Sequence, residues 1–218
     1  MLSVRFGHFT PPIRHVLCLG AHCDDLEIGC GGTVLKLTET PDPPAFTWVV
    51  FSSDATREAE ALRSADALLA RASVSRIIIK KFRDGFLPYE GSLVKEAFEE
   101  LKGEVSPDLI LTHYRDDLHQ DHRLISELTW NTFRDHLILE YEIPKWDGDL
   151  GAPNVFVPLE EPLCRRKIET ILTNFPSQAG KRWFSEELFR SILRVRGMEC
   201  NAPSNYAEAF YGKKLIVG

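Results

Sequence analysis

Two short clusters of histidine and aspartate carry most of the chemistry that this sequence could perform. Residues 22–25 (HCDD) directly follow the apolar run of residues 16–20 (VLCLG), and residues 117–122 (DLHQDH) follow the apolar run of residues 109–112 (LILT). One imidazole and one carboxylate from the first cluster, with one imidazole from the second, form a three-ligand set for zinc. Such a set leaves one coordination position open for water, which is typical of a catalytic zinc rather than a structural one.

The first cluster offers a division of labour between two adjacent acids. His22 and Asp25 are the predicted zinc ligands, whereas the carboxylate of Asp24 is free to face the bound water. Zinc lowers the pKa of such a water to about 7, and a nearby carboxylate can take its proton. We therefore expect Asp25 to hold the metal and Asp24 to move protons.

The second cluster supplies the remaining groups. His122 lies near a predicted helix start and is the expected third ligand. We expect Asp121 to orient His119 and to hold it protonated. A cationic imidazole beside the metal would then stabilise a developing oxyanion. His113, at the end of the preceding apolar run, is an alternative ligand, although a supporting role is the favoured interpretation.

The elements that must position these clusters alternate between strand and helix patterns. Apolar runs predict strands over residues 14–20, 46–52, 74–82, 109–113, 137–142, 154–159 and 207–217. Periodicity predicts helices beginning at Thr33 and over residues 56–72, 92–102, 121–134, 160–174 and 185–196. Repeated β-α units favour an α/β fold, Rossmann-like, with a mostly parallel sheet and helices on both faces. In the strand order 3-2-1-4-5, strands 1 and 4 flank the switch point, where such sheets bind ligands.

Local signals refine these elements. The glycines of residues 29–32 (GCGG) predict a sharp turn into the helix that begins at Thr33. Ser185 is the expected N-cap of the last helix, with Gly197 just past its end. Two helices have predicted inner faces, made of Leu62, Ala65, Leu68 and Leu69 in one and of Leu93, Ala97, Phe98 and Leu101 in the other.

Size and composition narrow the class of protein. The chain has 218 residues, 44% of them hydrophobic and 27% charged, with a formal net charge of -6. We expect a single domain over residues 1–218, with an arm over residues 1–13. The net charge argues against a nucleic-acid partner, and no apolar run is long enough for a membrane span. Five cysteines without framework spacing favour the cytoplasm, and the oligomeric state is left open, homo-oligomers included.

Beyond these deductions, the sequence resembles a known family. Residues 20–32 (GAHCDDLEIGCGG) resemble the HPDDxExGCGG signature of the LmbE-like, or PIG-L, zinc-dependent N-deacetylases. Residues 119–123 (HQDHR) resemble the second motif of that family, HxDH. Weaker matches extend the resemblance over most of the chain, at residues 56–60, 84–85, 177–178 and 206–210.

The resemblance implies a fold, an activity and a set of roles. It implies a Rossmann-like fold and hydrolysis of an N-acyl group, usually the acetyl group of an amino sugar or its conjugate. The implied Zn²⁺ ligands are His22, Asp25 and His122. The implied catalytic residues are Asp24 as general base and His119, backed by Asp121, as the group that stabilises the tetrahedral intermediate. Arg57 and Asp84 match positions that hold sugar hydroxyls.

Some features of the chain leave alternatives open. Cys23 replaces the usual proline of the signature, so the ligand loop is expected to be looser, with a thiol that could be oxidised or compete for metal. Arg57 has an alternative role as a surface partner of Glu60. Another divalent ion, such as iron or cobalt, suits the same donor set. The alternative functions are an amidase for another small amide and a non-catalytic ligand-binding module; a dinucleotide-binding protein is disfavoured because the turn lacks G-x-G-x-x-G.

Overall fold

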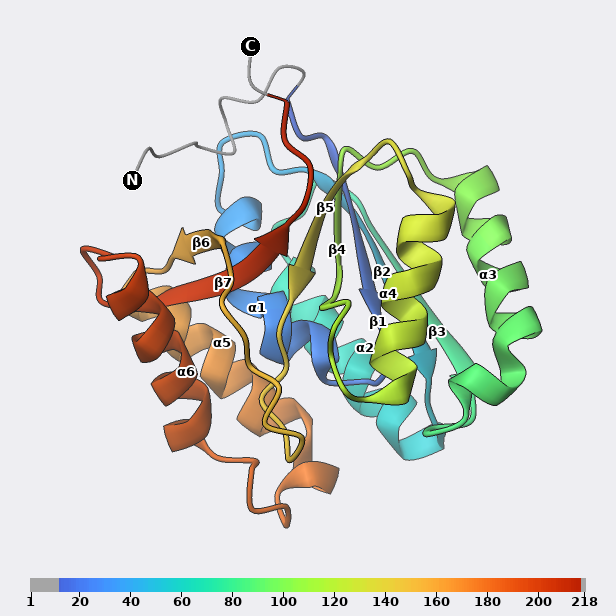
Figure 1. Cartoon of the computed structure of the whole chain (residues 1–218). Helices are drawn as coiled ribbons and strands as arrows, with labels where there is room; N and C mark the ends of the chain where they lie inside the picture. Colours follow the sequence, from blue (N-terminus) through green and yellow to red (C-terminus); the bar gives the residue numbers. More distant parts are fainter. Residues whose placement is uncertain (1–11, 217–218) are drawn as a thin grey trace.

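Seven strands form one sheet in the computed structural model, which describes residues 12–216 (Figure 1). The strand order is β3-β2-β1-β4-β5-β7-β6. Strands β1 to β5 are parallel, and β7 runs antiparallel to both of its neighbours. The strands are β1 (His15–Gly20), β2 (Ala45–Ser52), β3 (Ser75–Phe82), β4 (Leu109–His113), β5 (Leu137–Tyr141), β6 (Val155–Pro158) and β7 (Ala207–Gly212).

The predicted α/β architecture and the order 3-2-1-4-5 are confirmed. Val16 of β1 pairs with Leu109 of β4, so the two strands that precede the histidine and aspartate clusters are neighbours. The predicted arm lies almost wholly outside the described residues. The last strand is shorter than predicted, because β7 ends at Gly212. No helix of the described part of the chain is long and apolar enough to cross a membrane.

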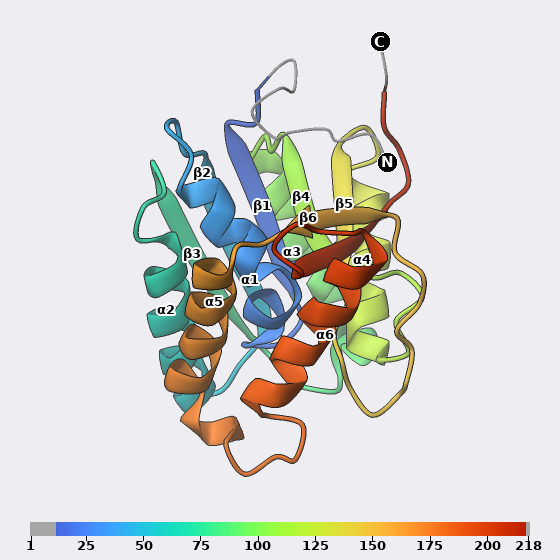
Figure 2. The same cartoon turned by 90° about the vertical axis from the view of Figure 1, so that its left-hand side faces the viewer.

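Helices cover both faces of the sheet (Figures 1 and 2). They are α1 (Asp25–Thr38), α2 (Ala55–Leu69), α3 (Gly91–Glu104), α4 (Gln120–Thr132), α5 (Glu161–Asn174) and α6 (Glu186–Glu199), with short 3-10 turns at Leu87–Glu90 and Pro176–Gln178. Contacts among α1, α2, α5 and α6 place them in one layer, and α3 packs with α4 in the other. Alternating residues of β1 enter the two layers, since Val16 lies in one apolar cluster and Leu17 in the other.

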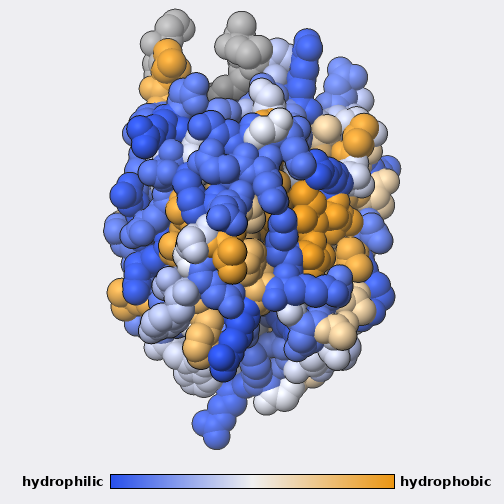
Figure 3. All heavy atoms as spheres, turned by 90° about the vertical axis from the view of Figure 1, so that its right-hand side faces the viewer, coloured by the Kyte–Doolittle hydropathy of each residue, from blue (hydrophilic) through white to orange (hydrophobic). Residues whose placement is uncertain are grey.

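The edges of the sheet are less completely covered. β3 is one edge strand, and its residues Ile77, Ile78 and Ile79 are half-buried. The face of the molecule shown in Figure 3 carries hydrophobic atoms within a mostly hydrophilic surface.

The predicted start of the first helix is wrong. α1 begins at Asp25, so the glycines that were expected to form a turn lie inside the helix. A Cβ atom on Gly29 would overlap the ring of Tyr141, and one on Gly32 would overlap Leu159. These glycines therefore allow close packing of α1 rather than a change of chain direction. Because of this longer helix, Asp25 lies in the first helical turn.

Two further details of the helices differ from prediction, and one agrees. Gly197 lies within α6 rather than beyond its end. This position needs a glycine because the backbone of Asn205 packs where a Cβ atom would be. Leu62 and Leu93 are 38% and 53% exposed, and their neighbours Ala61 and Val94 are buried instead. The N-cap at Ser185 is confirmed, since its side chain accepts a hydrogen bond from the backbone of Leu188.

Candidate active site

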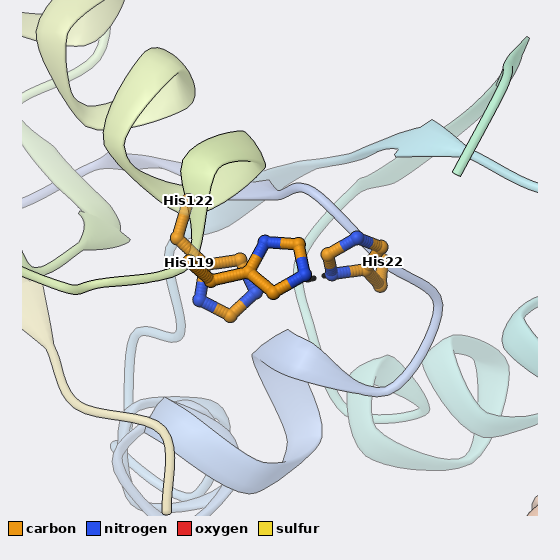
Figure 4. A group of neighbouring side chains, drawn as sticks. All are labelled: His22, His119 and His122. Carbon is orange, nitrogen blue, oxygen red and sulfur yellow. Dashed lines mark hydrogen bonds between the residues drawn. The ribbon is translucent and has the colours of Figure 1, made fainter. Parts of the chain in front are cut away.

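The adjacency of β1 and β4 brings the two clusters together at the carboxyl end of the sheet. His22 lies in the turn after β1, and His122 lies in the first turn of α4, which follows β4. Nδ1 of His22 is 3.1 Å from Nε2 of His122. Oδ2 of Asp25 lies 3.2 Å from the first nitrogen, and Oδ1 of Asp25 lies 3.5 Å from the second. Figure 4 shows the rings of His22, His119 and His122 converging.

These distances fit a tetrahedral ion. With metal–nitrogen bonds of about 2.0–2.1 Å, two ligand atoms of a tetrahedral zinc are roughly 3.3 Å apart. The three donor separations given above are close to that value. Burial and the neighbouring imidazole of His113 lower the pKa of His122 to about 3, so His122 is neutral, as a metal ligand must be. The residues present therefore fit a divalent ion.

Carboxylates behind the imidazoles fix their orientation. Nδ1 of His122 lies 2.9 Å from Oδ2 of Asp117. Nε2 of His22 lies 3.1 Å from Asp84 and 3.3 Å from Asp121. Burial opposes a charge on His22, but the surrounding carboxylates outweigh it and raise the pKa of this imidazole well above its usual value, so a bound ion would have to displace a proton from His22. Each imidazole thus has an acceptor on the nitrogen that faces away from the other imidazole.

Asp25 is surrounded by imidazoles. His113, completely buried, places Nε2 3.1 Å from Oδ2 of Asp25 and stacks on His122 with ring centroids 3.9 Å apart. Burial would raise the pKa of the Asp25 carboxyl, but the adjacent imidazoles of His122, His113 and His22 together lower it well below its usual value. Asp25 is therefore a carboxylate, which is the form that binds a cation.

Asp24 lies beside this set with one oxygen free. Its Oδ1 accepts a hydrogen bond of 2.8 Å from Arg57, whereas its buried Oδ2 has no hydrogen-bond partner among the described residues. Burial raises the pKa of Asp24, and the charge of Arg57 only partly offsets this. A buried carboxylate with a raised pKa and an unpartnered oxygen is suited to accept a proton.

The contact expected between Asp121 and His119 differs in the structure. The carboxylate of Asp121 accepts hydrogen bonds from the backbone of Gly85 and Leu87 and faces His22. Instead, the backbone N–H of Asp121 donates to Nδ1 of His119 at 3.2 Å. Burial and the charge of His22 lower the pKa of His119. His119 is therefore not held protonated, and its proton lies on Nε2 because Nδ1 accepts.

The two predicted sugar-binding residues both reach the site. Arg57 contacts Asp24 at 2.8 Å and also pairs with Glu60 at 3.8 Å, as the alternative predicted, but the two side chains are only 16% and 2% exposed, so the pair does not lie on a solvated face. Its other nitrogen donates to Ser177 at 3.3 Å. Asp84, by contrast, is 80% exposed beside His22. An exposed carboxylate at the mouth of a site is open to a ligand, and contact with sugar hydroxyls stays a prediction for both residues.

Cys23 does not have the reactivity that its position suggested. Its thiol donates to the backbone carbonyl of Ser52 at 3.4 Å, and its side chain is buried. Burial, assisted by Asp24 and opposed by Arg57, raises the pKa of Cys23 to about 12. A protonated thiol in this environment is a poor metal ligand and a poor nucleophile.

Three charged residues of the site were missed by the sequence analysis. Asp117 is the acceptor for His122, and its place at the head of the second cluster was a usable signal. Lys145 and Asp149 lie in the connection after β5, and Lys145 contacts both Asp117 and Asp149. No motif marks these two residues, because their role depends on a fold that brings distant segments together.

Comparisons with known proteins identify a family and a shared fold. The family model PIG-L, described as GlcNAc-PI de-N-acetylase, matches residues 17–133. N,N'-diacetylchitobiose deacetylase from Pyrococcus horikoshii aligns with a TM-score of 0.71 and 22% identity over 96% of this chain and 87% of that chain. A deacetylase of the teicoplanin biosynthetic pathway aligns with a TM-score of 0.70 and 18% identity over 91% and 97% of the two chains. The 4-carboxy-2-hydroxymuconate hydratase of Pseudomonas putida aligns with a TM-score of 0.71 and 15% identity over 94% and 98%.

The fold and the family match define a hydrolase of the deacetylase class. The chain belongs to the PIG-L, or LmbE-like, family, whose model covers more than half of its length. This confirms the resemblance seen in the sequence. Metal dependence is general to the family, and the donor set described above fits a metal. The structural likenesses themselves, all at low identity, show the shared fold.

Proposed function

We propose that this protein is a zinc-dependent hydrolase that removes the acetyl group from an N-acetylated amino sugar or its conjugate. The observation that carries the proposal is the convergence of His22, Asp25 and His122 at donor separations of 3.1 to 3.5 Å, with the free oxygen of Asp24 beside them. Family membership supports deacetylation, and the chitobiose deacetylase among the structural relatives supports a sugar substrate.

His22, Asp25 and His122 would hold the metal. When bound, a zinc ion would supply a Lewis acid and lower the pKa of a water to about 7. Asp117 and Asp121 keep the outward nitrogens of the two imidazoles occupied, so that Nδ1 of His22 and Nε2 of His122 point inward. Other divalent ions suit these donors, so zinc is the proposed rather than the required ion.

Asp24 moves the proton in this mechanism. Its free Oδ2 accepts a proton from the attacking water and later passes it to the nitrogen of the leaving amine. Arg57 fixes the other oxygen, which keeps Oδ2 directed away from that contact. Water adds to the amide carbon and the carbon–nitrogen bond breaks, so that acetate and a free amine are the products.

His119 stabilises the developing charge through its Nε2–H. Because Nδ1 of His119 accepts from the backbone of Asp121, Nε2 is a donor even in the neutral imidazole. A donor aimed at the carbonyl oxygen stabilises the tetrahedral intermediate more than the substrate. Asp121 thus positions His119 through its backbone and His22 through its carboxylate. Arg57 and Asp84 are proposed to contact sugar hydroxyls.

The expected setting is the cytoplasm. The cysteines at positions 18, 23, 30, 164 and 200 are all free, which supports a reducing compartment. The proposed partner is a small acetylated sugar, and the net charge of -6 gives no support for nucleic acid.

Amine release from a panel of acetylated compounds tests this function. The panel contains N-acetylglucosamine, its nucleoside diphosphate conjugate, its glycosides and simple acetamides. Each compound is assayed with zinc-loaded protein and again after the metal has been removed by a chelator. We expect amine release from at least one sugar, loss after chelation and recovery with zinc. Release from simple acetamides alone would favour the amidase alternative, and metal binding without any release would favour a binding module. The hydratase among the structural relatives makes this assay necessary, because the fold alone does not select the reaction.

A further inference from the structure

A loop connects β5 to β6 (Figure 1). The side chain of Lys145 in this loop contacts Asp117 of the site. Nζ of Lys145 donates to Oδ2 of Asp117 at 2.9 Å and also to Asp149. The same oxygen of Asp117 lies 2.9 Å from Nδ1 of His122. The side chain of Lys145 is 12% exposed, and those of Asp117 and Asp149 are 2% and 6% exposed. A largely buried group of charges therefore lies directly behind a proposed metal ligand.

These contacts hold the segment after β4 at two points. Oδ2 of Asp149 accepts from the backbone of Leu118 at 2.7 Å. Oδ1 of Asp117 accepts from the backbone of His119 at 2.8 Å. The lysine and its two carboxylates thus join the connection after β5 to the segment that carries His119. Arg123 also faces this group, but it donates to the backbone carbonyls of Asp117 and Leu118.

The rest of the connection is anchored away from the site or faces solvent. The carbonyl of Gly151 accepts from Arg196, and its N–H donates to the hydroxyl of Tyr211. Trp146 and Leu150 are 78% and 41% exposed. Lys145 and Asp149 are consequently the side chains of this connection that link it to the histidines of the site.

We propose that Lys145 is a positioning residue of the metal site, and that residues 145–149 form a clamp whose closure is coupled to metal binding. The proposal rests on His122 being a metal ligand, as proposed above. Without the ammonium group, Asp117 and Asp149 would be two buried carboxylates without a counter-charge, which is unfavourable. Asp117 would then leave His122, whose Nδ1 would lose the acceptor that keeps Nε2 free for metal. By reciprocity, metal binding favours the closed clamp.

Zinc affinity tests the positioning role directly. Affinities from chelator competition would be compared for the parent protein, Lys145→Met, Lys145→Arg and Lys95→Met. Lys95 is the matched control, because it bridges α3 and α4 through Asn131 and Thr132, away from the metal-site residues. We expect Lys145→Met to lose about 10- to 100-fold in affinity. Lys145→Arg should retain most of it, because a guanidinium can serve two carboxylates, and Lys95→Met should match the parent.

Equal zinc affinity in folded Lys145→Met and the parent would overturn the proposal. A parent that binds no zinc would instead contradict the proposed function, so the two failures are distinguishable. Limited proteolysis of the parent needs no variant and decides the coupling even if Lys145→Met does not fold. We expect zinc to slow cleavage within residues 145–151, and cleavage there at the same rate with and without zinc would contradict the clamp.

Discussion

Two buried polar clusters lie against helix α1, and they differ in how completely their atoms are partnered. The site cluster, at the start of the helix, is His22, Asp24, Asp25 and His122. The anchor cluster, further along the helix, is Lys167 and Glu208. Nζ of Lys167 donates to Glu208 and to the carbonyl of Ile28, each at 2.6 Å. Glu208 accepts in turn from the backbone of Gly32 and Thr33.

The site cluster lacks this completeness. Among residues 12–216, Oδ2 of Asp24 has no hydrogen-bond partner, and the facing nitrogens of His22 and His122 lie 3.1 Å apart beside the carboxylate of Asp25. A fully partnered buried pair fixes a packing arrangement, whereas unpartnered donors and acceptors are poised for a ligand. One cluster therefore holds the helix in place, whereas the other leaves free the atoms that the proposed chemistry needs.

Removal of a metal ligand should give the largest effect and break only the site cluster. We expect His122→Ala to lose zinc and to reduce deacetylation to background, because the donor set falls to two. The fold should persist, since the anchor cluster is intact. Metal content after dialysis, amine release and thermal unfolding measure the three outcomes. Stoichiometric zinc in this variant would assign the metal to other residues.

Loss of the proton acceptor should give the next largest effect. Asp24→Asn keeps the size of the side chain and its contact with Arg57 but cannot accept a proton at Oδ2. We expect zinc content equal to the parent and a fall in kcat of about 10²- to 10⁴-fold. Turnover at the parent rate would remove Asp24 from the role of general base.

The anchor cluster should respond in the opposite way. Lys167→Met leaves Glu208 as a buried carboxylate without its cation, and we expect the free energy of unfolding to fall by about 3–5 kcal/mol. The folded fraction should keep its zinc affinity, because no residue of the site cluster is changed. Chemical denaturation measures the first result and chelator competition the second. Lys181→Met, at an exposed lysine, is the control and should be near neutral.

Glu27 offers the smallest and most specific comparison, because it is buried near the site cluster and neither of its oxygens has a hydrogen-bond partner within residues 12–216. Burial raises the pKa of Glu27 to about 8 from an ordinary 4.5. The folded state therefore binds this proton more tightly than the unfolded state, and stability falls as pH rises from about 4.5 to 8. In metal-free protein, Glu27→Gln should remove this loss and raise the unfolding temperature at pH 8 but not at pH 4.5. An unchanged difference between the two pH values would contradict the shifted pKa.

Much of the fold was predictable because it follows from patterns within single segments. β1 and β4 are continuous apolar runs, and the rules for parallel sheets then make them neighbours. The start of α1 was not predictable from residues 29–32. The glycines there are required because Tyr141 and Leu159, from other parts of the chain, pack too closely for a side chain. The sequence alone does not distinguish a glycine required for close packing from a glycine required for a turn.

The candidate site shows the same division. The residue types and positions of His22, Asp25 and His122 were enough to predict that these side chains converge, because sheet topology brings their segments together. The partner of Asp121 was mistaken, because helix α4 directs its carboxylate to His22 and its backbone N–H to His119. The roles of Lys145 and Asp149 could not be predicted from the sequence, because they depend on contacts between distant segments that no local pattern indicates.

Anomalous diffraction from crystals of the zinc-loaded protein tests the central claim most directly. The account predicts one peak at the zinc edge, within about 2.0–2.2 Å of Nδ1 of His22, Nε2 of His122 and an oxygen of Asp25. A well-occupied peak that lacks any of these three ligands would contradict it.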